Sequence, residues 1–242
     1  MPMPLRWIVS LLFGLQIYLM MGLMALWFTP WAAVDRRGAH AAARNWCRWV
    51  RWSARAMLGL RTEVRGQIPR GEVLIAAKHQ SFLDIILIVS EVPQPRFIMK
   101  RELTWAPILG WYALRIGCVP VDRGKRGQAI AQMKEGVRKG QARPGQLIIY
   151  PEGTRTAPGA RPAYKIGTGV LYDQLGQTCV PAATNVGLFW PRRGVMRRPG
   201  LAVVEFLAPI APGMSTGAFM AELERRIEGA TARLLAEGGF TR

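Results

Sequence analysis

The stretch that decides the fold reads Val73-Leu-Ile-Ala-Ala-Lys-His-Gln-Ser-Phe-Leu-Asp84. It begins with an apolar run of strand length and continues, after Ser81, into an apolar segment with helical character. His79 therefore lies where a strand ends and a helix begins. Open α/β sheets place their ligand crevice at the carboxyl ends of their strands. We predict a functional site around His79.

Short apolar runs and helical segments alternate along the rest of the chain. This alternation predicts an α/β fold: a mostly parallel mixed sheet flanked by helices, preceded by an N-terminal membrane helix and a basic interfacial helix. The expected strands are Val73–Ala77, Arg96–Met99, Cys118–Val121, Gln146–Tyr150, Thr178–Ala183 and Leu201–Leu207. The expected helices are Phe82–Val89, Pro107–Arg115, Gly127–Lys139, Ile166–Leu175 and Ser215–Leu235.

The N-terminus is strongly apolar, with no charged side chain between residues 7 and 34. Its centre, Ile8–Phe28, is long enough as a helix to cross a hydrocarbon layer of about 30 Å. Trp7, Trp27 and Trp31 flank this run, as is typical of membrane–water interfaces. We expect a membrane helix; a cleaved signal peptide and a buried core helix are the two alternatives.

A basic segment follows at His40–Leu60. Arg44, Arg48, Arg51 and Arg55 are spaced by four, three and four residues, so a helix would align them along one side. Arginines beside tryptophans are typical of a helix that lies in the membrane interface and contacts anionic lipid. The alternative is a solvated helix that packs on the domain. Arginine loading after the apolar run predicts that the remaining chain faces the cytoplasm.

Composition supports a membrane setting. The chain has 33 Lys and Arg against 15 Asp and Glu, a formal net charge of +18. Such a charge attracts nucleic acid, anionic membrane or phosphorylated substrates, and the apolar N-terminus favours the membrane. Three widely separated cysteines form neither a disulfide framework nor a zinc motif. We divide the chain into membrane-anchoring helices at residues 1–60 and an α/β domain at residues 61–242.

His79 and Asp84 are the candidate catalytic pair. An aspartate in the first turns of a helix can hydrogen bond to a histidine just before it, which fixes the imidazole tautomer and leaves the other ring nitrogen to accept a proton. Taken alone, the pattern is more typical of a structural histidine than of a catalytic one. We expect no metal, because the only other histidine, His40, lies in the basic helix.

Basic residues follow other expected strands at the same edge of the sheet. They are Lys100, Arg123 and Arg155. Arginine suits bidentate binding of phosphate. Gly153 would let a backbone N–H approach an anion closely.

In their order and spacing these segments resemble the glycerolipid acyltransferases, the family typified by 1-acylglycerol-3-phosphate acyltransferase. The resemblance spans about residues 60 to 210. His79–Asp84 matches the H-x4-D block, and Gly117–Arg123 is similar to the second block with its terminal Arg. Tyr150-Pro-Glu-Gly-Thr-Arg155 is similar to F-P-E-G-T-R-S, with Tyr for Phe and Thr156 for Ser. Val180-Pro-Ala182 stands where V-P-V or V-P-I is usual. Lys100 falls in a K-x-E-L segment, and Lys165 falls in Tyr164-Lys-Ile-Gly167, which stands where the family has F-K-x-G.

The resemblance implies acyl transfer from acyl-coenzyme A or acyl-carrier protein to the sn-2 hydroxyl of lysophosphatidic acid, with no further cofactor. His79 would act as general base and Asp84 would orient it. Arg123 and Arg155, with Gly153 and Thr154, would bind the phosphate. Glu152 would either order the turn or contact the glycerol moiety. Lys100 or a backbone N–H would stabilise the oxyanion, and Lys165 is a further candidate phosphate contact.

The sequence is also compatible with other functions. The acceptor could be another lysolipid, such as a lyso-ornithine lipid or lysophosphatidylglycerol. A non-catalytic, membrane-tethered nucleic-acid binder would instead interleave aromatic and basic residues on the globular domain, but the aromatics gather near the N-terminus. We therefore expect anionic lipid and the two substrates as partners, no nucleic acid, and a location on the cytoplasmic face of the inner membrane.

Overall fold

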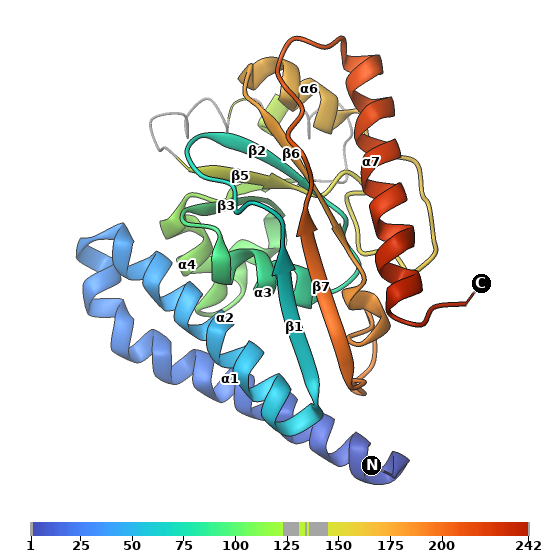
Figure 1. Ribbon diagram of the computed structural model, residues 1–242. Helices are drawn as coiled ribbons and strands as arrows, with labels where there is room; N and C mark the ends of the chain where they lie inside the picture. The colour runs from blue at the N-terminus through green and yellow to red at the C-terminus, as the bar shows by residue number, and fades with distance from the viewer. Residues whose placement is uncertain (1, 123–130, 134, 136–144, 242) are drawn as a thin grey trace.

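The computed structural model describes residues 2–122, 131–133, 135 and 145–241. Within these residues the strands form one seven-stranded sheet in the order β1-β7-β6-β2-β5-β3-β4 (Figure 1). Neighbouring strands are parallel except for the antiparallel pair β6 and β7. The expected mostly parallel mixed sheet is confirmed. The strands are β1 (Leu60–Arg65), β2 (Val73–Ala77), β3 (Pro95–Lys100), β4 (Val119–Val121), β5 (Gln146–Ile149), β6 (Cys179–Thr184) and β7 (Gly200–Phe206).

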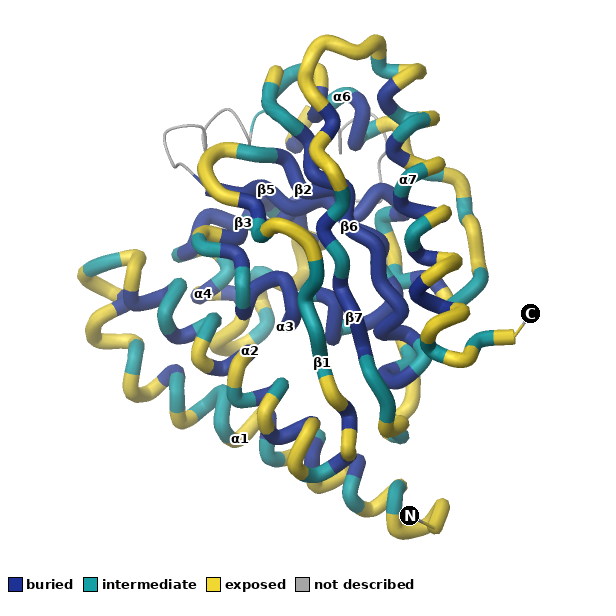
Figure 2. Tube along the Cα trace, in the orientation of Figure 1, coloured by how far each residue is buried: buried dark blue, intermediate teal, exposed yellow. Residues whose placement is uncertain are grey.

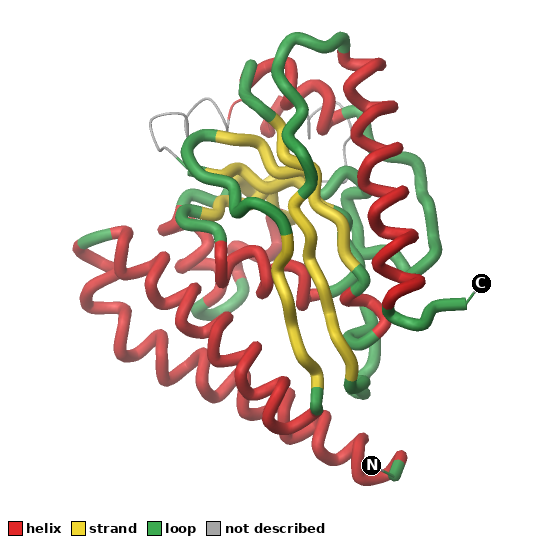
Figure 3. Tube along the Cα trace, in the orientation of Figure 1, coloured by secondary structure: helices red, strands yellow, loops and turns green. Residues whose placement is uncertain are grey.

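Helices cover both faces of the sheet (Figures 1 and 3). On one face lie α2, α3 and α4, whose buried residues share one apolar core with α1. On the other face α6 and α7 share a second core. The bounds are α1 (Met3–Val34), α2 (Arg36–Leu58), α3 (Phe82–Glu91), α4 (Leu109–Ile116), α6 (Gly167–Leu175) and α7 (Thr216–Glu237), with short 3-10 turns η1 (Arg101–Trp105) and η2 (Val186–Leu188).

Strand β2 shows how one apolar run serves both cores. Ile75 and Ala77 belong to the core under α3, whereas Leu74 and Ala76 belong to the core under α7. All four side chains are almost fully buried. A central parallel strand is covered on both faces, so its sequence is continuously apolar rather than alternating.

Helices α1 and α2 form an antiparallel hairpin beside the α/β domain (Figure 1). Trp46 donates from Nε1 to the carbonyl of Ile17 at 2.8 Å, which ties the two helices together. The outer side of α1 is largely exposed although it is apolar, with Leu26 at 79% and Trp27 at 80% exposure (Figure 2). By length and composition α1 is the one helix of the described chain able to cross a membrane. It extends beyond the expected Ile8–Phe28 segment at both ends.

The arginine stripe of α2 divides between solvent and protein. Arg48 and Arg55 are exposed. Arg44 donates to the carbonyl of Pro93 at 2.6 Å, and Arg51 forms an ion pair with Glu91 of α3. Half of the stripe therefore attaches the hairpin to the α/β domain, and only the other half is available to lipid phosphates.

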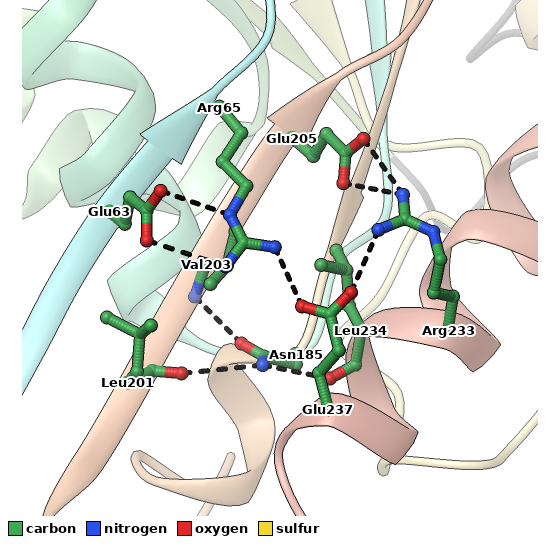
Figure 4. A network of polar contacts seen from close by, with 9 residues as sticks. All are labelled: Glu63, Arg65, Asn185, Leu201, Val203, Glu205, Arg233, Leu234 and Glu237. Atoms are coloured by element: carbon green, nitrogen blue, oxygen red, sulfur yellow. Dashed lines mark hydrogen bonds and ion pairs between the residues drawn. The ribbon is translucent and has the colours of Figure 1, made fainter.

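Polar contacts attach the end of α7 to the edge strand β1 and to its neighbour β7 (Figure 4). Arg65 of β1 contacts Glu237 at 2.7 Å, and Arg233 contacts Glu205 of β7 at 2.7 Å. These pairs are partly exposed, so water screens the attraction between their charges and they contribute little to stability. The buried side chain of Asn185 accepts from the N–H of Val203 and donates to the carbonyl of Leu234.

The expected elements are found with two exceptions. Strand β1 was not among the expected strands, although it pairs along its length with β7. The expected helix Gly127–Lys139 falls largely outside the described residues, and Arg123 lies entirely outside them.

Candidate active site

His79 and Asp84 lie together at the junction of β2 and α3. His79 Nδ1 is 3.0 Å from Asp84 Oδ1 and 3.2 Å from Oδ2. The aspartate is fully buried, and its Oδ2 accepts the backbone N–H groups of Gln80 and Ser81 at 2.9 and 2.8 Å. A carboxylate fixed in this way favours the proton on Nδ1, which leaves Nε2 as the acceptor nitrogen.

The turn that carries these residues has a sequence signal of its own. Ser81 is the N-cap of α3, and its Oγ accepts from the N–H of Leu83. Asp84, the third residue of the helix, in turn accepts from the N–H of Ser81. This reciprocal capping box satisfies N–H groups that would otherwise be unpaired at the helix start. The local sequence therefore places the Asp84 carboxylate beside the His79 ring.

The backbone of His79 is held by the loop after β5. Its N–H donates to Glu152 Oε2 at 2.9 Å, and its carbonyl accepts from the N–H of Thr156 at 2.8 Å. The imidazole stacks on the ring of Tyr150 with 3.9 Å between ring centroids. Burial, aided by the nearby charge of Asp84, raises the pKa of Tyr150 well above its usual value, so its hydroxyl stays protonated.

A buried ion network lies behind this turn. Lys78 Nζ is 2.9 Å from Glu152 Oε1 and 2.6 Å from Glu228 Oε1 of α7, and the Tyr164 hydroxyl also donates to Glu228. The side chains of Lys78 and Glu152 are 1% and 0% exposed. Burial raises the pKa of Glu152, and the adjacent Lys78 opposes that shift. Of the two roles left open for Glu152, ordering the turn is the one that these contacts favour.

A cavity of about 450 Å³ opens beside the His79 ring. Most of its wall is apolar and comes from the helical hairpin, α3, β3 and α4, for example Met21, Trp46, Phe82, Met99 and Leu109. The polar and charged wall residues include His79, Lys100, Thr154, Arg155 and Arg192. An apolar pocket with a few converging polar groups is the usual form of a ligand site.

Three of the candidate substrate-binding residues line this cavity. Thr154 and Arg155 do so from the loop after β5, and Lys100 from the end of β3, where it pairs with Glu102 at 2.8 Å. Arg192 also lines the cavity, and the sequence alone gave it no role. Its only sequence signal is that it opens a basic segment between Pro191 and Gly200.

Two other candidates lie outside the cavity wall. The N–H of Gly153 donates to the carbonyl of Tyr150 at 2.9 Å, so it closes the turn rather than facing an anion. Gly153 has a φ of 67°, which favours glycine. Lys165 is exposed and runs over this turn, where a Cβ on Gly153 would come within 2.6 Å of its Nζ.

Cys118 and Ser81 are poorly suited to act as nucleophiles in covalent catalysis. Burial raises the pKa of Cys118 to about 11, so its thiol stays protonated near neutral pH. The Ser81 hydroxyl is fully buried and engaged in the helix cap. No group of three His, Cys, Asp or Glu side chains within the described residues could hold a metal ion.

Comparison with known proteins shows which proteins this chain resembles. The family model described as Acyltransferase matches residues 61–185. The chain is 33% identical to the 1-acyl-sn-glycerol-3-phosphate acyltransferase of Pseudomonas aeruginosa, covering 80% of this chain and 76% of the relative. It is 29% identical to the enzyme of the same name from Saccharomyces cerevisiae, covering 76% of this chain and 63% of the relative. The crystal structure of the 1-acyl-sn-glycerophosphate (LPA) acyltransferase from Thermotoga maritima has the same fold, with a TM-score of 0.74 at 22% identity over 95% of this chain and 98% of that one.

Proposed function

The chain belongs to the acyltransferase family, and we propose that it transfers a fatty acyl group from acyl-coenzyme A or acyl-carrier protein to the sn-2 hydroxyl of lysophosphatidic acid, forming phosphatidic acid. The observation that carries this proposal is the His79–Asp84 pair at the wall of an apolar cavity that also presents cationic side chains. His79 can serve the hydroxyl of the acceptor, the apolar wall can hold the acyl chain, and the cationic side chains can bind the phosphate.

His79 acts as the general base in this mechanism. The sn-2 hydroxyl oxygen attacks the thioester carbonyl carbon while His79 Nε2 takes the hydroxyl proton. Asp84, bound to Nδ1, stabilises the imidazolium that forms. The tetrahedral intermediate then collapses, its C–S bond breaks, and the departing thiolate takes the proton from Nε2 to leave as the thiol. An ester bond forms, a thioester bond breaks, and the imidazole returns to its neutral state.

The charge that develops on the carbonyl oxygen needs a hydrogen-bond donor. Lys100 lines the same cavity as His79 and is the side chain that we assign to this role, with a backbone N–H of the surrounding loops as the alternative. The phosphate of the acceptor would bind Arg155, with Thr154 beside it. Arg123 belongs to this group by its motif alone.

The helical hairpin accounts for the apolar substrates. Met21 and Met24 of α1 line the cavity, whereas the opposite side of α1 exposes leucines and tryptophans. We propose that this exposed side is buried in the inner membrane, with the α/β domain in the cytoplasm. A lysolipid could then reach His79 without leaving an apolar environment.

The test is a panel of acceptors given to the purified protein in detergent. Labelled oleoyl groups are supplied on coenzyme A or on acyl-carrier protein. We expect transfer to lysophosphatidic acid at a higher kcat/KM than to lysophosphatidylglycerol or a lyso-ornithine lipid. A folded protein that acylates one of these other lysolipids and leaves lysophosphatidic acid untouched would overturn the assignment of the acceptor. Salt-dependent DNA binding without any acyl transfer would overturn the class of function.

A further inference from the structure

Two arginines from distant segments hold each other at the cavity wall. Arg192 donates from Nη1 to the carbonyl of Arg155 at 2.9 Å, and Arg155 donates from Nη1 to the carbonyl of Arg192 at 3.4 Å. The two residues are 37 positions apart in the chain. Both line the cavity that contains His79. These reciprocal side chain–backbone bonds fix both arginines in the cavity wall that also contains the proposed base.

The turn that contains His79 and Gln80 positions both arginines. Next to Arg155, the N–H and the hydroxyl of Thr156 both donate to the carbonyl of His79. On the other side, the N–H of Gly187 in η2 donates to Gln80 Oε1 at 3.0 Å. One short segment around His79 therefore anchors the loop of Arg155 and the turn that precedes Arg192.

The chain between η2 and Arg192 is also fixed by packing. Trp190 is 5% exposed and meets Phe82 of α3 and Phe13 of α1 edge-on, with ring centroids 6.5 and 5.5 Å apart. Arg192 follows two residues later. The backbone at Arg192 is therefore held in place by this packing, although its side chain is exposed.

The charge at this wall is unbalanced. Neither Arg155 nor Arg192 forms an ion pair with a carboxylate among the described residues. Two positive charges at one wall of a cavity repel each other, and an anion that binds both removes that repulsion. A phosphate monoester carries about −1.5 to −2 charges and has three terminal oxygens, as found for phosphorylated side chains near neutral pH. It can accept bidentate hydrogen bonds from two guanidinium groups at once.

We infer that Arg192 is a second phosphate-binding residue that, together with Arg155, clamps the phosphate monoester of the acceptor lysolipid. This inference rests on the proposed function and extends it to head-group selection. A phosphodiester head has fewer terminal oxygens and less charge, so the clamp favours a monoester acceptor. The phosphates of coenzyme A share the same chemistry, and the experiment must separate the two sources.

The experiment compares Arg192→Ala with Arg193→Ala as its matched control. Arg193 is the adjacent arginine, is exposed and does not line the cavity. In Arg192→Ala we expect the KM for lysophosphatidic acid to rise by about tenfold to a hundredfold, the effect of losing hydrogen bonds to a charged group. The KM for oleoyl-coenzyme A and the kcat/KM for 1-acylglycerol, which has no phosphate, should match those of Arg193→Ala. Arg192→Lys keeps the charge but not the fork, so its KM should fall between those of the parent and Arg192→Ala.

Two results would overturn the inference. A rise confined to the KM for oleoyl-coenzyme A would assign Arg192 to the donor, and a lysophosphatidic acid KM equal to that of Arg193→Ala would show that no clamp exists. Calorimetric binding of glycerol 3-phosphate to the parent and both variants tests the clamp without turnover. If the parent fails to acylate lysophosphatidic acid yet binds glycerol 3-phosphate more tightly than Arg192→Ala does, the proposed function fails and the phosphate site stands. If Arg192→Ala binds glycerol 3-phosphate as tightly as the parent and Arg193→Ala do, the phosphate site is refuted as well.

Discussion

Replacing Lys78 by methionine leaves two buried carboxylates without the cation that joins them. Lys78 Nζ lies 2.9 Å from Glu152 and 2.6 Å from Glu228, and none of the three side chains is more than 9% exposed. Methionine keeps most of the apolar stem and removes the charge. The variant therefore tests the ion network rather than the packing around it.

The size of the effect follows from the protonation of one carboxylate. Breaking a buried ion pair by removing one partner destabilises a protein by about 3–5 kcal/mol. The unpaired glutamate can avoid being buried with a charge by taking up a proton. For a carboxylate with a usual pKa of about 4.3, protonation costs about 3.7 kcal/mol at pH 7 and about 1.6 kcal/mol at pH 5.5. We expect Lys78→Met to lose about 4 kcal/mol of unfolding free energy at pH 7 and about 2 kcal/mol at pH 5.5.

The sign follows from linkage. The carboxyl left behind has a folded-state pKa above its unfolded value, so the folded variant binds more protons than the unfolded chain in this window. Its stability relative to the parent therefore falls as the pH rises from about 4.3 through the raised folded-state pKa. Adding Glu228→Gln to Lys78→Met removes one of the two charges and should recover part of the loss.

Urea unfolding in detergent, followed by tryptophan fluorescence at both pH values, measures these changes. Lys100→Met is the matched control, because the Lys100–Glu102 pair has a similar length of 2.8 Å but both side chains are 53% exposed. We expect about 0–1 kcal/mol for the control and no dependence on pH. The reasoning is refuted if Lys78→Met costs no more than Lys100→Met, or if its loss is the same at pH 5.5 as at pH 7.

Two further predictions concern the helical hairpin. Burial, together with the charges of Arg44 and other arginines, lowers the pKa of His40 from 6.5 to about 4. At a pH between these two values only the unfolded chain gains the proton, so the unfolding free energy should drop as the pH falls, by at most about 1.4 kcal/mol per pH unit. His40→Gln should remove this part of the pH dependence when unfolding free energies are measured from pH 7 to 4.5. An equal pH dependence in parent and variant would contradict the prediction. Gly38→Ala would place its Cβ 2.6 Å from the backbone nitrogen of Ala32 and should lose about 1–3 kcal/mol in the same assay, whereas Gly14→Ala, with nothing within 4 Å, should be neutral or stabilising by up to about 1 kcal/mol. An equal response of the two glycine variants would show that the helices do not approach as described.

The candidate catalytic pair could be predicted from the sequence because its geometry is local. Only five positions separate His79 from Asp84, and the strand before them and the capped helix after them are set by nearby residues. The common edge of Lys100 and Arg155 was predictable for a related reason. Lys100 is the last residue of β3 and Arg155 lies in the loop after β5, and these two parallel strands end on the same side of the sheet.

Strand β1 was missed because its pattern is weak. The segment Leu60–Arg65 contains two aliphatic residues among charged and polar ones, and only Leu60 is buried. It lies at the edge of the sheet, where one side of the strand has no partner strand. Its position depends on the parallel pairing with β7, which comes more than a hundred residues later.

The ion network and the arginine pair could not be predicted for the same physical reason. Lys78 meets Glu228 across 150 positions of sequence, and Arg155 meets Arg192 across 37. Such contacts depend on how the layers stack, and no local pattern specifies them. The one available signal was a lysine at the end of an otherwise apolar strand, since a buried lysine requires a charged partner.

The central claim is that His79 is the base, and its most direct test is the rate of phosphatidic acid formation by His79→Ala. Parent and variant receive the same labelled oleoyl-coenzyme A and lysophosphatidic acid, with urea unfolding as a check of the fold. The account predicts a kcat lower by about a hundredfold to ten-thousandfold, the usual contribution of a general base. It also predicts an unfolding free energy that is unchanged to within about 1 kcal/mol. A folded His79→Ala protein that forms phosphatidic acid at a rate close to that of the parent would contradict the account.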